Sequence, residues 1–208
     1  MNRTYIIRLL KEIQDIMVEN RDYLINLDSI VGDGDLGLTM SDGFVAAYKA
    51  VLDSEEPDIG KILYNAGKAM STAVPSTMGT LMASGFMQAG KVLKGKTELT
   101  DMDIADIFGA YLEGVANRGK AKVGDKTFLD GLDPAVKALK EALNAGELLP
   151  VAATKARVAA EEGFKNTTNM IAVHGRAVTR GEASRTLEDP GAAVAMLIMK
   201  AFEKTVVG

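Results

Sequence analysis

The chain has 208 residues, 47% of them hydrophobic and 25% charged, which is enough to bury one sizeable core. Its net charge of −4 disfavours a general role at nucleic acids or membrane surfaces, and the absence of cysteine excludes disulfides and thiolate metal sites. The N-terminus does not resemble a signal peptide, and the longest apolar run, Ala192 to Met199, is too short to cross a bilayer. We therefore expect a single domain over residues 1–208, a cytoplasmic location, and neither a nucleic-acid nor a membrane partner.

Helical periodicity runs through the whole chain. In the first expected helix, from Thr4 to Leu27, apolar residues recur every three or four positions, starting with Ile6 and Leu10. The remaining seven helices are expected to start near residue 39, to cover 58–73 and 79–94, to start at 100, to cover 127–144 and 149–170, and to run from 189 through 202. No segment shows the sustained two-residue alternation of a strand. The sequence therefore predicts an all-α fold, an antiparallel bundle or barrel of eight helices.

Several helix starts carry capping chemistry. Thr100 and Asp103 have the spacing of a capping box. Asp189 followed by Pro190 has the pattern of an N-cap with proline at the first helical position. Thr39 is expected to cap the second helix in the same way.

Proline and glycine inside expected helices indicate local departures or close contacts. Pro134 is expected to kink or break the sixth helix, because proline lacks the amide hydrogen that a helix interior requires. Glycines such as Gly85, Gly90 and Gly114 cost helix stability, and they indicate close approach of neighbouring helices.

The most informative segment lies directly after the first helix, where Asp28, Asp33 and Asp35 surround two glycines. From Asp22 to Tyr48 there are five aspartates and no lysine or arginine. Carboxylates this close repel one another, and a bound hard cation relieves the repulsion. Mg²⁺ takes carboxylate oxygens together with phosphates and water. A solvated acidic turn is the alternative, but the position between two apolar stretches favours a metal loop.

Four polar or glycine-rich segments separate the expected helices, at residues 32–37, 76–79, 119–127 and 174–190. In an up-down bundle the loops after the first, third, fifth and seventh helices share one end, so these four segments are expected to meet there. Residues 118–126 have a net charge of +3, and residues 174–185 contain three arginines and one acidic residue. Either basic loop alone could be a solvated loop. Together with the acidic loop and the amides of helix starts, they predict a site for a polyphosphate with divalent ions.

Four motifs support a more specific prediction: Leu27–Met40, Gly119–Thr127, Gly175–Ala177 and Asp189–Ala192. In order and spacing they resemble the L subunit of dihydroxyacetone kinases over essentially the whole chain. The resemblance implies an eight-helix antiparallel barrel that binds ADP or ATP through two Mg²⁺ ions at one end. It also implies phosphoryl transfer to a substrate held by a separate K subunit. The phosphoryl donor would be either ATP exchanged for ADP or a sugar phosphotransferase protein that recharges the bound nucleotide.

The same resemblance assigns site residues position by position. It implies that Asp28, Asp33 and Asp35 are metal ligands. It implies nucleotide or phosphate contacts for Thr39, Ser76, Thr77, Gly119, Phe128, Arg176, Asp189 and Gly191. Arg176 would in addition offset charge on the transferring group, the one catalytic role expected here, while a general base would come from the K subunit.

Two departures from the family pattern leave the acceptor open. Leu36 stands where the best-known members carry histidine, and Pro75–Gly79 replaces a glycine-rich Ser-Gly-Pro segment. The acceptor could be dihydroxyacetone, erythrulose or another short ketose. His174, the only histidine, is interpreted as a loop residue beside Arg176 and not as a catalytic group. Two alternative functions are a nucleotide-bound regulatory partner without kinase activity and a kinase component for a different acceptor.

Overall fold

A computed structural model describes residues 1–208 and confirms the all-α fold. Its elements are α1 (Arg3–Glu19), α2 (Arg21–Val31), α3 (Leu36–Lys49), α4 (Ile59–Ala73), α5 (Thr77–Val92), α6 (Asp101–Gly119), α7 (Phe128–Asn144), α8 (Leu149–Asn166), the 3₁₀ segments η1 (Thr167–Asn169) and η2 (Arg176–Ser184), and α9 (Pro190–Val207). The one β feature is an isolated bridge between Asn2 and Glu98.

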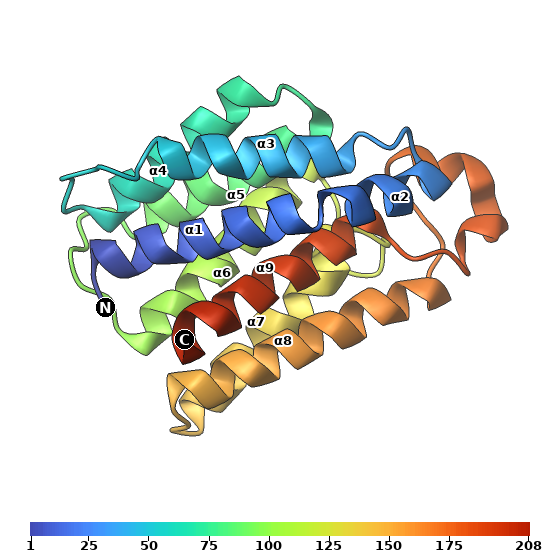
Figure 1. Cartoon of the computed structure of the whole chain (residues 1–208). Helices are drawn as coiled ribbons and strands as arrows, with labels where there is room; N and C mark the ends of the chain where they lie inside the picture. The colour runs from blue at the N-terminus through green and yellow to red at the C-terminus, as the bar shows by residue number, and fades with distance from the viewer.

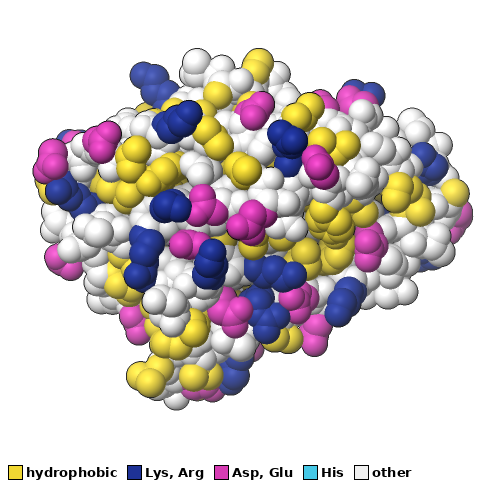
Figure 2. Space-filling model, in the orientation of Figure 1, with side chains coloured by type: hydrophobic (Ala, Val, Ile, Leu, Met, Phe, Trp, Pro, Cys, Tyr) yellow, Lys and Arg dark blue, Asp and Glu magenta, His cyan; other side chains and the backbone are white.

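The helices form a closed antiparallel ring. From α3 to α9 each helix packs against its successor, α3 also packs against α1 and α2, and α9 returns to α1 (Figure 1). Both chain termini lie at one end of the bundle, while the end of α2 and the segment before α9 lie at the other (Figure 1). The latter end is called the mouth below. No helix is long and apolar enough to cross a membrane, and acidic and basic side chains intermingle over the face shown in Figure 2.

The first expected helix is divided into two, so the bundle has nine α-helices instead of eight. Asn20 separates α1 from α2 in a non-helical conformation, and its side-chain amide donates to the carbonyl of Ile16 at 2.8 Å. α2 then continues to Val31, four residues beyond the expected end at Leu27. As a result, Asp28 lies in the last turn of a helix and not in the acidic loop.

Five of the six helix starts that carry a side-chain cap agree with prediction to within a residue. They are the starts of α1, α4, α6, α7 and α9, capped by Asn2, Asp58, Thr100, Thr127 and Asp189. In the sixth, Ser76 caps α5, which starts at Thr77, two residues before the predicted start. The start of α3 was predicted wrongly: it follows Asp35, whose side chain makes no capping hydrogen bond, and Thr39 is a buried residue in the helix interior.

Of the kink or break expected at Pro134, the break does not occur, because α7 continues through this residue. Proline cannot donate a hydrogen bond to the carbonyl of Asp130 one turn earlier. Gly163 of α8 lies against this carbonyl so closely that a Cβ on Gly163 would be 2.4 Å from the oxygen. The proline therefore marks the place where α7 and α8 approach each other, and the helix remains intact.

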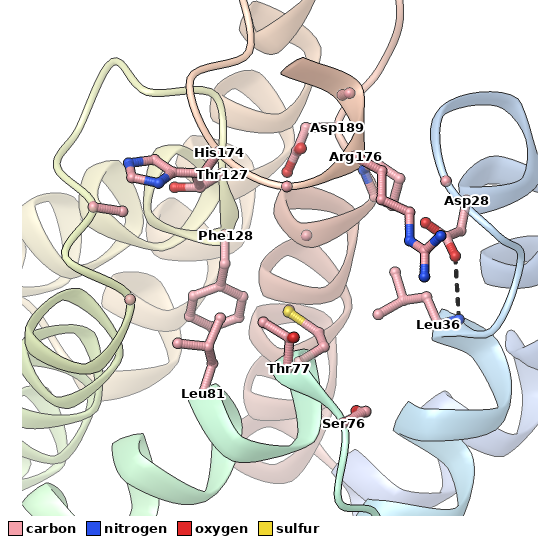
Figure 3. Close-up of a pocket in the computed structure, with 18 of the residues that line it drawn as sticks. Asp28, Leu36, Ser76, Thr77, Leu81, Thr127, Phe128, His174, Arg176 and Asp189 are labelled. Carbon is pink, nitrogen blue, oxygen red and sulfur yellow. Dashed lines mark hydrogen bonds between the residues drawn. The ribbon is translucent and has the colours of Figure 1, made fainter. Parts of the chain in front are cut away.

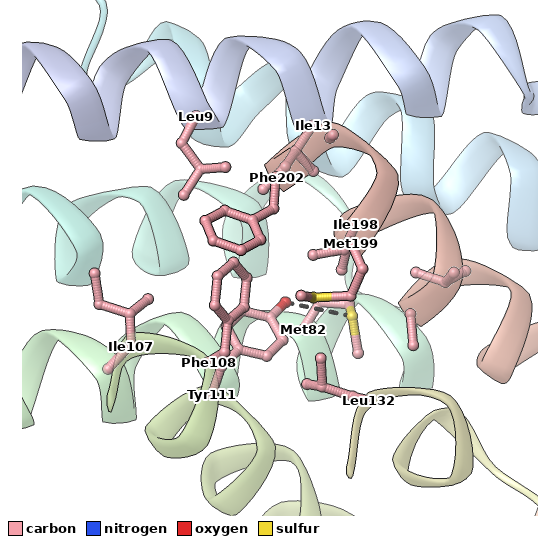
Figure 4. Close-up of a cluster of buried hydrophobic side chains, with 14 of the residues drawn as sticks. Leu9, Ile13, Met82, Ile107, Phe108, Tyr111, Leu132, Ile198, Met199 and Phe202 are labelled. Atoms are coloured by element: carbon pink, nitrogen blue, oxygen red, sulfur yellow. Dashed lines mark hydrogen bonds between the residues drawn. The ribbon is translucent and has the colours of Figure 1, made fainter. Parts of the chain in front are cut away.

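The interior of the ring is filled by one cluster of 54 buried residues. At its centre the rings of Phe108 and Phe202 meet edge to face with centroids 4.8 Å apart (Figure 4). The hydroxyl of Tyr111, also in this cluster, donates to Sδ of Met82 at 3.3 Å. The barrel therefore has a solid apolar core, and the polar chemistry is confined to its surface and ends.

Glycines allow neighbouring helices to approach closely, as predicted. A Cβ on Gly114 of α6 would lie 2.5 Å from the carbonyl oxygen of Ser84 on α5. On the other side of α5, a Cβ on Gly90 would lie 2.6 Å from the carbonyl oxygen of Gly60 on α4. α5 is therefore held between two neighbours at distances that exclude even a methyl group.

Replacing Gly114 with alanine is expected to lower the free energy of unfolding by about 1–3 kcal/mol, because α5 and α6 must separate. Alanine has a higher helix propensity than glycine by about 1 kcal/mol, and the cost of separating the two helices should exceed this gain. Gly109→Ala, in the same helix, is the control: the nearest atom to its Cβ would be Nζ of Lys140, at 3.3 Å, the far end of a flexible side chain and not backbone. Urea denaturation of both variants tests this, and equal effects would contradict the close-packing argument.

Candidate functional site

The mouth of the bundle contains a cavity of about 760 Å³. Residues from all four segments that were expected to converge line it, together with residues from the last turns of α2 and α6. α3, α5, α7 and α9 all begin at this cavity. Because a helix start exposes amide hydrogens and partial positive charge, four such starts make the mouth suitable for an anion.

All the predicted site residues except Thr39 line this cavity. The set is Asp28, Asp33, Asp35, Ser76, Thr77, Gly119, Phe128, Arg176, Asp189 and Gly191. Thr39 is 8% exposed within α3 and is not among the lining residues. Its predicted phosphate contact therefore has no support in the geometry.

Three carboxylates form an acidic cluster at one side of the cavity. One oxygen each from Asp28, Asp33 and Asp35 lies within 4.8 Å of the others. The backbone amide of Leu36 donates to Oδ2 of Asp28 at 3.3 Å (Figure 3). Desolvation raises the pKa of Asp28; the Leu36 amide opposes this rise, and the neighbouring charge of Asp33 adds to it. Three converging carboxylate oxygens, one of them partly desolvated, suit ligation of a hard divalent cation.

The loop that carries this cluster turns at Gly34, where φ is +75°. A side chain would be strained in this left-handed conformation, and a Cβ would also lie 2.5 Å from Oγ of Ser29. Glycine at this position lets Asp33 and Asp35 return toward the end of α2.

Arg176 brings positive charge to the acidic cluster from a distant part of the sequence. Its Nη2 lies 2.5 Å from Oδ2 of Asp33. The arginine side chain is 69% exposed, so water screens the ion pair and it contributes little to stability. The guanidinium is therefore free to exchange its carboxylate partner for another anion in the cavity. The fold thus brings a positive charge to the acidic cluster from a loop that was expected to converge on it.

The opposite side of the cavity carries an apolar patch. Phe128 and Leu81 lie together there, across from Arg176 and Asp28 (Figure 3). Val115 also lines the cavity. Sequence reasoning missed Leu81 and Val115, because apolar residues at helical spacing have the same pattern as core residues. A ligand in this cavity would meet charge on one side and apolar surface on the other.

His174 is fixed by a buried carboxylate. Its Nε2 lies 3.0 Å from Oδ2 of Asp125, which also accepts a hydrogen bond from the amide of Lys122 at 2.9 Å. The Lys122 amide and, to a smaller extent, His174 hold the pKa of Asp125 below its usual range although burial opposes them. The amide of Val173 donates to the carbonyl of Asp125 at 3.1 Å. Asp125, which the sequence did not single out, thus joins the two basic loops.

Lys126 lines the cavity, but its ammonium is hydrogen-bonded to backbone and is not free to bind a ligand, contrary to the prediction from the basic loop. The residue is 2% exposed. Its ammonium donates to backbone carbonyls between Thr167 and Leu187. The net charge of residues 118–126 therefore overstates the positive charge that a ligand would meet.

Asp189 caps α9 and is the most perturbed acid at the mouth. Its Oδ2 accepts a hydrogen bond from the amide of Ala192 at 2.7 Å. Desolvation raises the pKa of Asp189 to about 7; the Ala192 amide and Lys126 oppose the rise, and the charge of Asp130 adds to it. In the folded chain this carboxyl therefore holds its proton over a pH range in which an unfolded aspartate is ionised.

The raised pKa of Asp189 predicts a pH-dependent stability difference between the wild type and Asp189→Asn. Asparagine also caps helices but does not titrate. Since the folded state binds the extra proton, the free energy of unfolding of the wild type, relative to the variant, should fall as pH rises from about 4 to about 7. The fall should be about 1.4 kcal/mol per unit of pKa difference. Denaturant titrations across this range test it, and a constant difference would contradict it.

Comparison with known proteins gives a consistent assignment. A family model described as the DAK2 domain matches residues 30–204. The chain is 34% identical over 200 residues to the Escherichia coli protein named PEP-dependent dihydroxyacetone kinase, ADP-binding subunit DhaL, covering 96% of this chain and 95% of that one. It is 33% identical to L-erythrulose 1-kinase of Mycolicibacterium smegmatis, covering 95% of this chain but 34% of that longer protein.

A solved structure has the same fold. The native dihydroxyacetone kinase of C. freundii superposes with a TM-score of 0.74 at 21% identity, covering 96% of this chain and 34% of that one. The same kinase in complex with AMP-PNP and Mg²⁺ gives a TM-score of 0.72 at 20% identity, covering 95% and 33%. The fold, the family model and the full-length relatives agree, and this chain belongs to the DAK2 domain family.

Proposed function

We propose that this chain is the nucleotide-binding subunit of a dihydroxyacetone-type kinase. It binds ADP or ATP with Mg²⁺ and transfers a phosphoryl group to a short ketose held by a separate K subunit. One observation carries the proposal: a single cavity places three carboxylates within 4.8 Å of one another on one side and an apolar patch on the other. The E. coli relative, which is similar over nearly its whole length, is named as an ADP-binding subunit.

The acidic cluster is the proposed metal site. Bound Mg²⁺, two ions in this proposal, supplies the charge neutralisation that phosphoryl transfer requires. Asp28 offers oxygens from the rigid end of α2, while Asp33 and Asp35 offer theirs from the loop that follows. Because the cluster lines the same cavity as Arg176, metal and phosphate can be held side by side.

Arg176 and the helix starts are the proposed phosphate contacts. The guanidinium already pairs with Asp33 at 2.5 Å and, being largely exposed, can turn to a phosphoryl oxygen. Ser76 and Thr77 stand at the start of α5 and line the cavity, where amides and a hydroxyl would be available to an anion. Phosphoryl transfer depends chiefly on such positioning and on charge stabilisation, so no covalent intermediate on this chain is required.

The apolar patch is the proposed seat of the nucleoside. Phe128 and Leu81 offer flat and aliphatic surface to a base, and Gly119 leaves room beside them. A Cβ on Gly119 would lie 3.2 Å from Cδ2 of Leu81, so a larger residue there would crowd this side of the cavity.

Substrate capture and the phosphoryl donor are assigned to partners. The cavity holds no free lysine ammonium and no cysteine that could capture a carbonyl group, because Lys126 is bonded to backbone carbonyls. A K subunit docking over the mouth would present the ketose. The donor is either ATP, exchanged for ADP, or a phosphotransferase protein. One relative, 34% identical to the chain, is named as PEP-dependent, and another, 30% identical, as PTS-dependent.

Two alternatives are testable with the same protein. The relative named L-erythrulose 1-kinase, 33% identical over the matched region, favours erythrulose as a second candidate acceptor. A regulatory role, in which the nucleotide-bound chain acts on a partner without transferring phosphate, would use the same cavity.

Asp33→Asn and Asp35→Asn are each expected to weaken binding of Mg-ADP at least tenfold, a loss of about 1.4 kcal/mol, because a metal ligand is lost. Chelation of Mg²⁺ should release ADP from the wild type. Asp42→Asn is the control, since Asp42 belongs to the same acidic stretch but is exposed on α3 away from the cavity. Isothermal titration calorimetry measures all three, and a metal-cluster variant that binds as tightly as the wild type would refute the site.

Phosphorylation of dihydroxyacetone or erythrulose is expected only when the cognate K subunit is present. A coupled assay with Mg-ATP, repeated with a phosphotransferase donor, measures turnover with and without that subunit. Arg176→Ala should reduce kcat much more than it weakens docking, because Arg176 acts on the transferring charge. Turnover by the isolated chain would contradict the two-subunit mechanism, and no turnover with any partner or donor would favour the regulatory role.

A further inference from the structure

Lys126 has an unusual environment for a lysine. Its ammonium lies among five backbone carbonyls and makes no ion pair. The three short hydrogen bonds go to the carbonyls of Leu187 at 2.5 Å, Ser184 at 2.6 Å and Thr167 at 2.7 Å. Two longer ones go to Arg185 at 3.2 Å and Met170 at 3.3 Å. An ammonium has three hydrogens, so the three short contacts satisfy it and the other two oxygens complete a cage.

The backbone at Lys126 is also exceptional. Its φ is +62°, in the left-handed region that a residue with a side chain rarely adopts and that costs it about 1–2 kcal/mol. The side chain is 2% exposed, and burial lowers its pKa while the charge of Asp189 opposes this. A strained, desolvated lysine persists only where its contacts outweigh both costs.

The carbonyl cage lies at the neck of a loop. Thr167 and Met170 stand at the start of the segment between α8 and α9, and residues 184–187 stand near its end. Further hydrogen bonds join the two sides: the amide of Ala172 donates to Oγ of Ser184 at 3.0 Å, and the amide of Asp189 donates to Oγ1 of Thr167 at 3.1 Å. Arg176, at the distal part of the loop, lines the cavity. Asp189 follows the neck directly and caps α9.

We propose that Lys126 is a positioning residue whose ammonium acts as a tethered monovalent cation. It closes the neck of residues 167–187 and thereby holds Arg176 and Asp189 at the cavity. The part that concerns nucleotide rests on the proposed function, whereas the closing of the loop does not. Five converging carbonyl oxygens form the kind of ligand set that K⁺ takes from backbone, and NH₄⁺ donates the same hydrogen bonds as the lysine.

Lys126→Gly tests this by removing the tethered cation and leaving the cage. Glycine adopts the left-handed conformation without strain. In tetramethylammonium chloride, trypsin should cleave the variant after Arg176, Arg180 or Arg185 at least about tenfold faster than the wild type, because cleavage follows the open population. In the same buffer the variant should bind Mg-ADP at least about tenfold more weakly. KCl or NH₄Cl at equal ionic strength should largely restore both quantities, and LiCl should not.

Two variants serve as controls. Lys120→Gly makes the same substitution in the same loop at a second left-handed lysine, with φ +52°, but this side chain is exposed. It should show no dependence on the monovalent cation. Lys126→Met removes the charge but fills the space, so KCl and NH₄Cl should restore neither protease resistance nor affinity.

The outcomes separate this proposal from the proposed function. If the wild type fails to bind Mg-ADP, the nucleotide function is wrong, and the protease measurement still decides whether Lys126 closes the loop. Lys126→Gly that resists trypsin like the wild type in tetramethylammonium chloride would overturn the proposal. So would a variant that stays cleavable or unfolded in every salt, or one that Li⁺ restores as well as K⁺.

Discussion

The antiparallel packing of successive helices decides where the chemistry of this chain gathers. From α3 onward each helix runs opposite to the one before it, across connections that are short except for the segment between α8 and α9. α3, α5, α7 and α9 therefore all begin at the mouth, and α4, α6 and α8 all begin at the opposite end. Because every second loop returns to the same place, residues as distant as Asp28 and Gly191 line one cavity. The apolar ring supplies rigidity, and the loops at one of its ends supply the ligands.

Convergence also changes the electrostatic character of each segment. The acidic cluster has no basic neighbour in sequence, yet Arg176 reaches Asp33 from the segment before α9. The basic loop before α7 loses one of its charges to the interior, because Lys126 is buried among carbonyls. The mouth is thus less polarised than the sequence suggests, and its charges are partly compensated before any ligand enters. Such compensation limits repulsion in the free protein while leaving exposed groups able to exchange partners.

Sequence predicted the fold class and most helix starts, because a capping side chain is a local signal that directly satisfies exposed amides. Asp58, Thr100, Thr127 and Asp189 illustrate this. The start of α3 was missed because Asp35 makes no capping hydrogen bond and its carboxylate belongs to the acidic cluster instead. The break at Asn20 was missed because it involves neither proline nor glycine.

The site residues that belong to sequence motifs could be predicted, whereas those that line the cavity only because of helix packing could not. Asp28, Asp33, Asp35 and Arg176 belong to short motifs whose residue types indicate their chemistry, and the structure brings them together. Leu81 and Val115 line the cavity from helix interiors, where an apolar residue has the same pattern whether it faces the core or a ligand. The role of Lys126 was likewise not predictable. Whether its ammonium binds a phosphate or the carbonyls of a loop depends on contacts between residues distant in sequence, such as Lys126 and Leu187, which are 61 positions apart.

The end of α2 and the start of α3 place opposite partial charges at the mouth. α2 finishes at Val31, so the carbonyls of its last turn add partial negative charge beside Asp28. α3 begins at Leu36, and its first amides carry partial positive charge. The two opposite poles flank one short loop and produce a field gradient across it. In the proposed role, a metal–phosphate pair is stabilised when its cation lies toward α2 and its anion toward α3, and the reversed pair meets like charge at both poles. Selection between the two orientations of the ligand is therefore built into the backbone, independently of any single side chain.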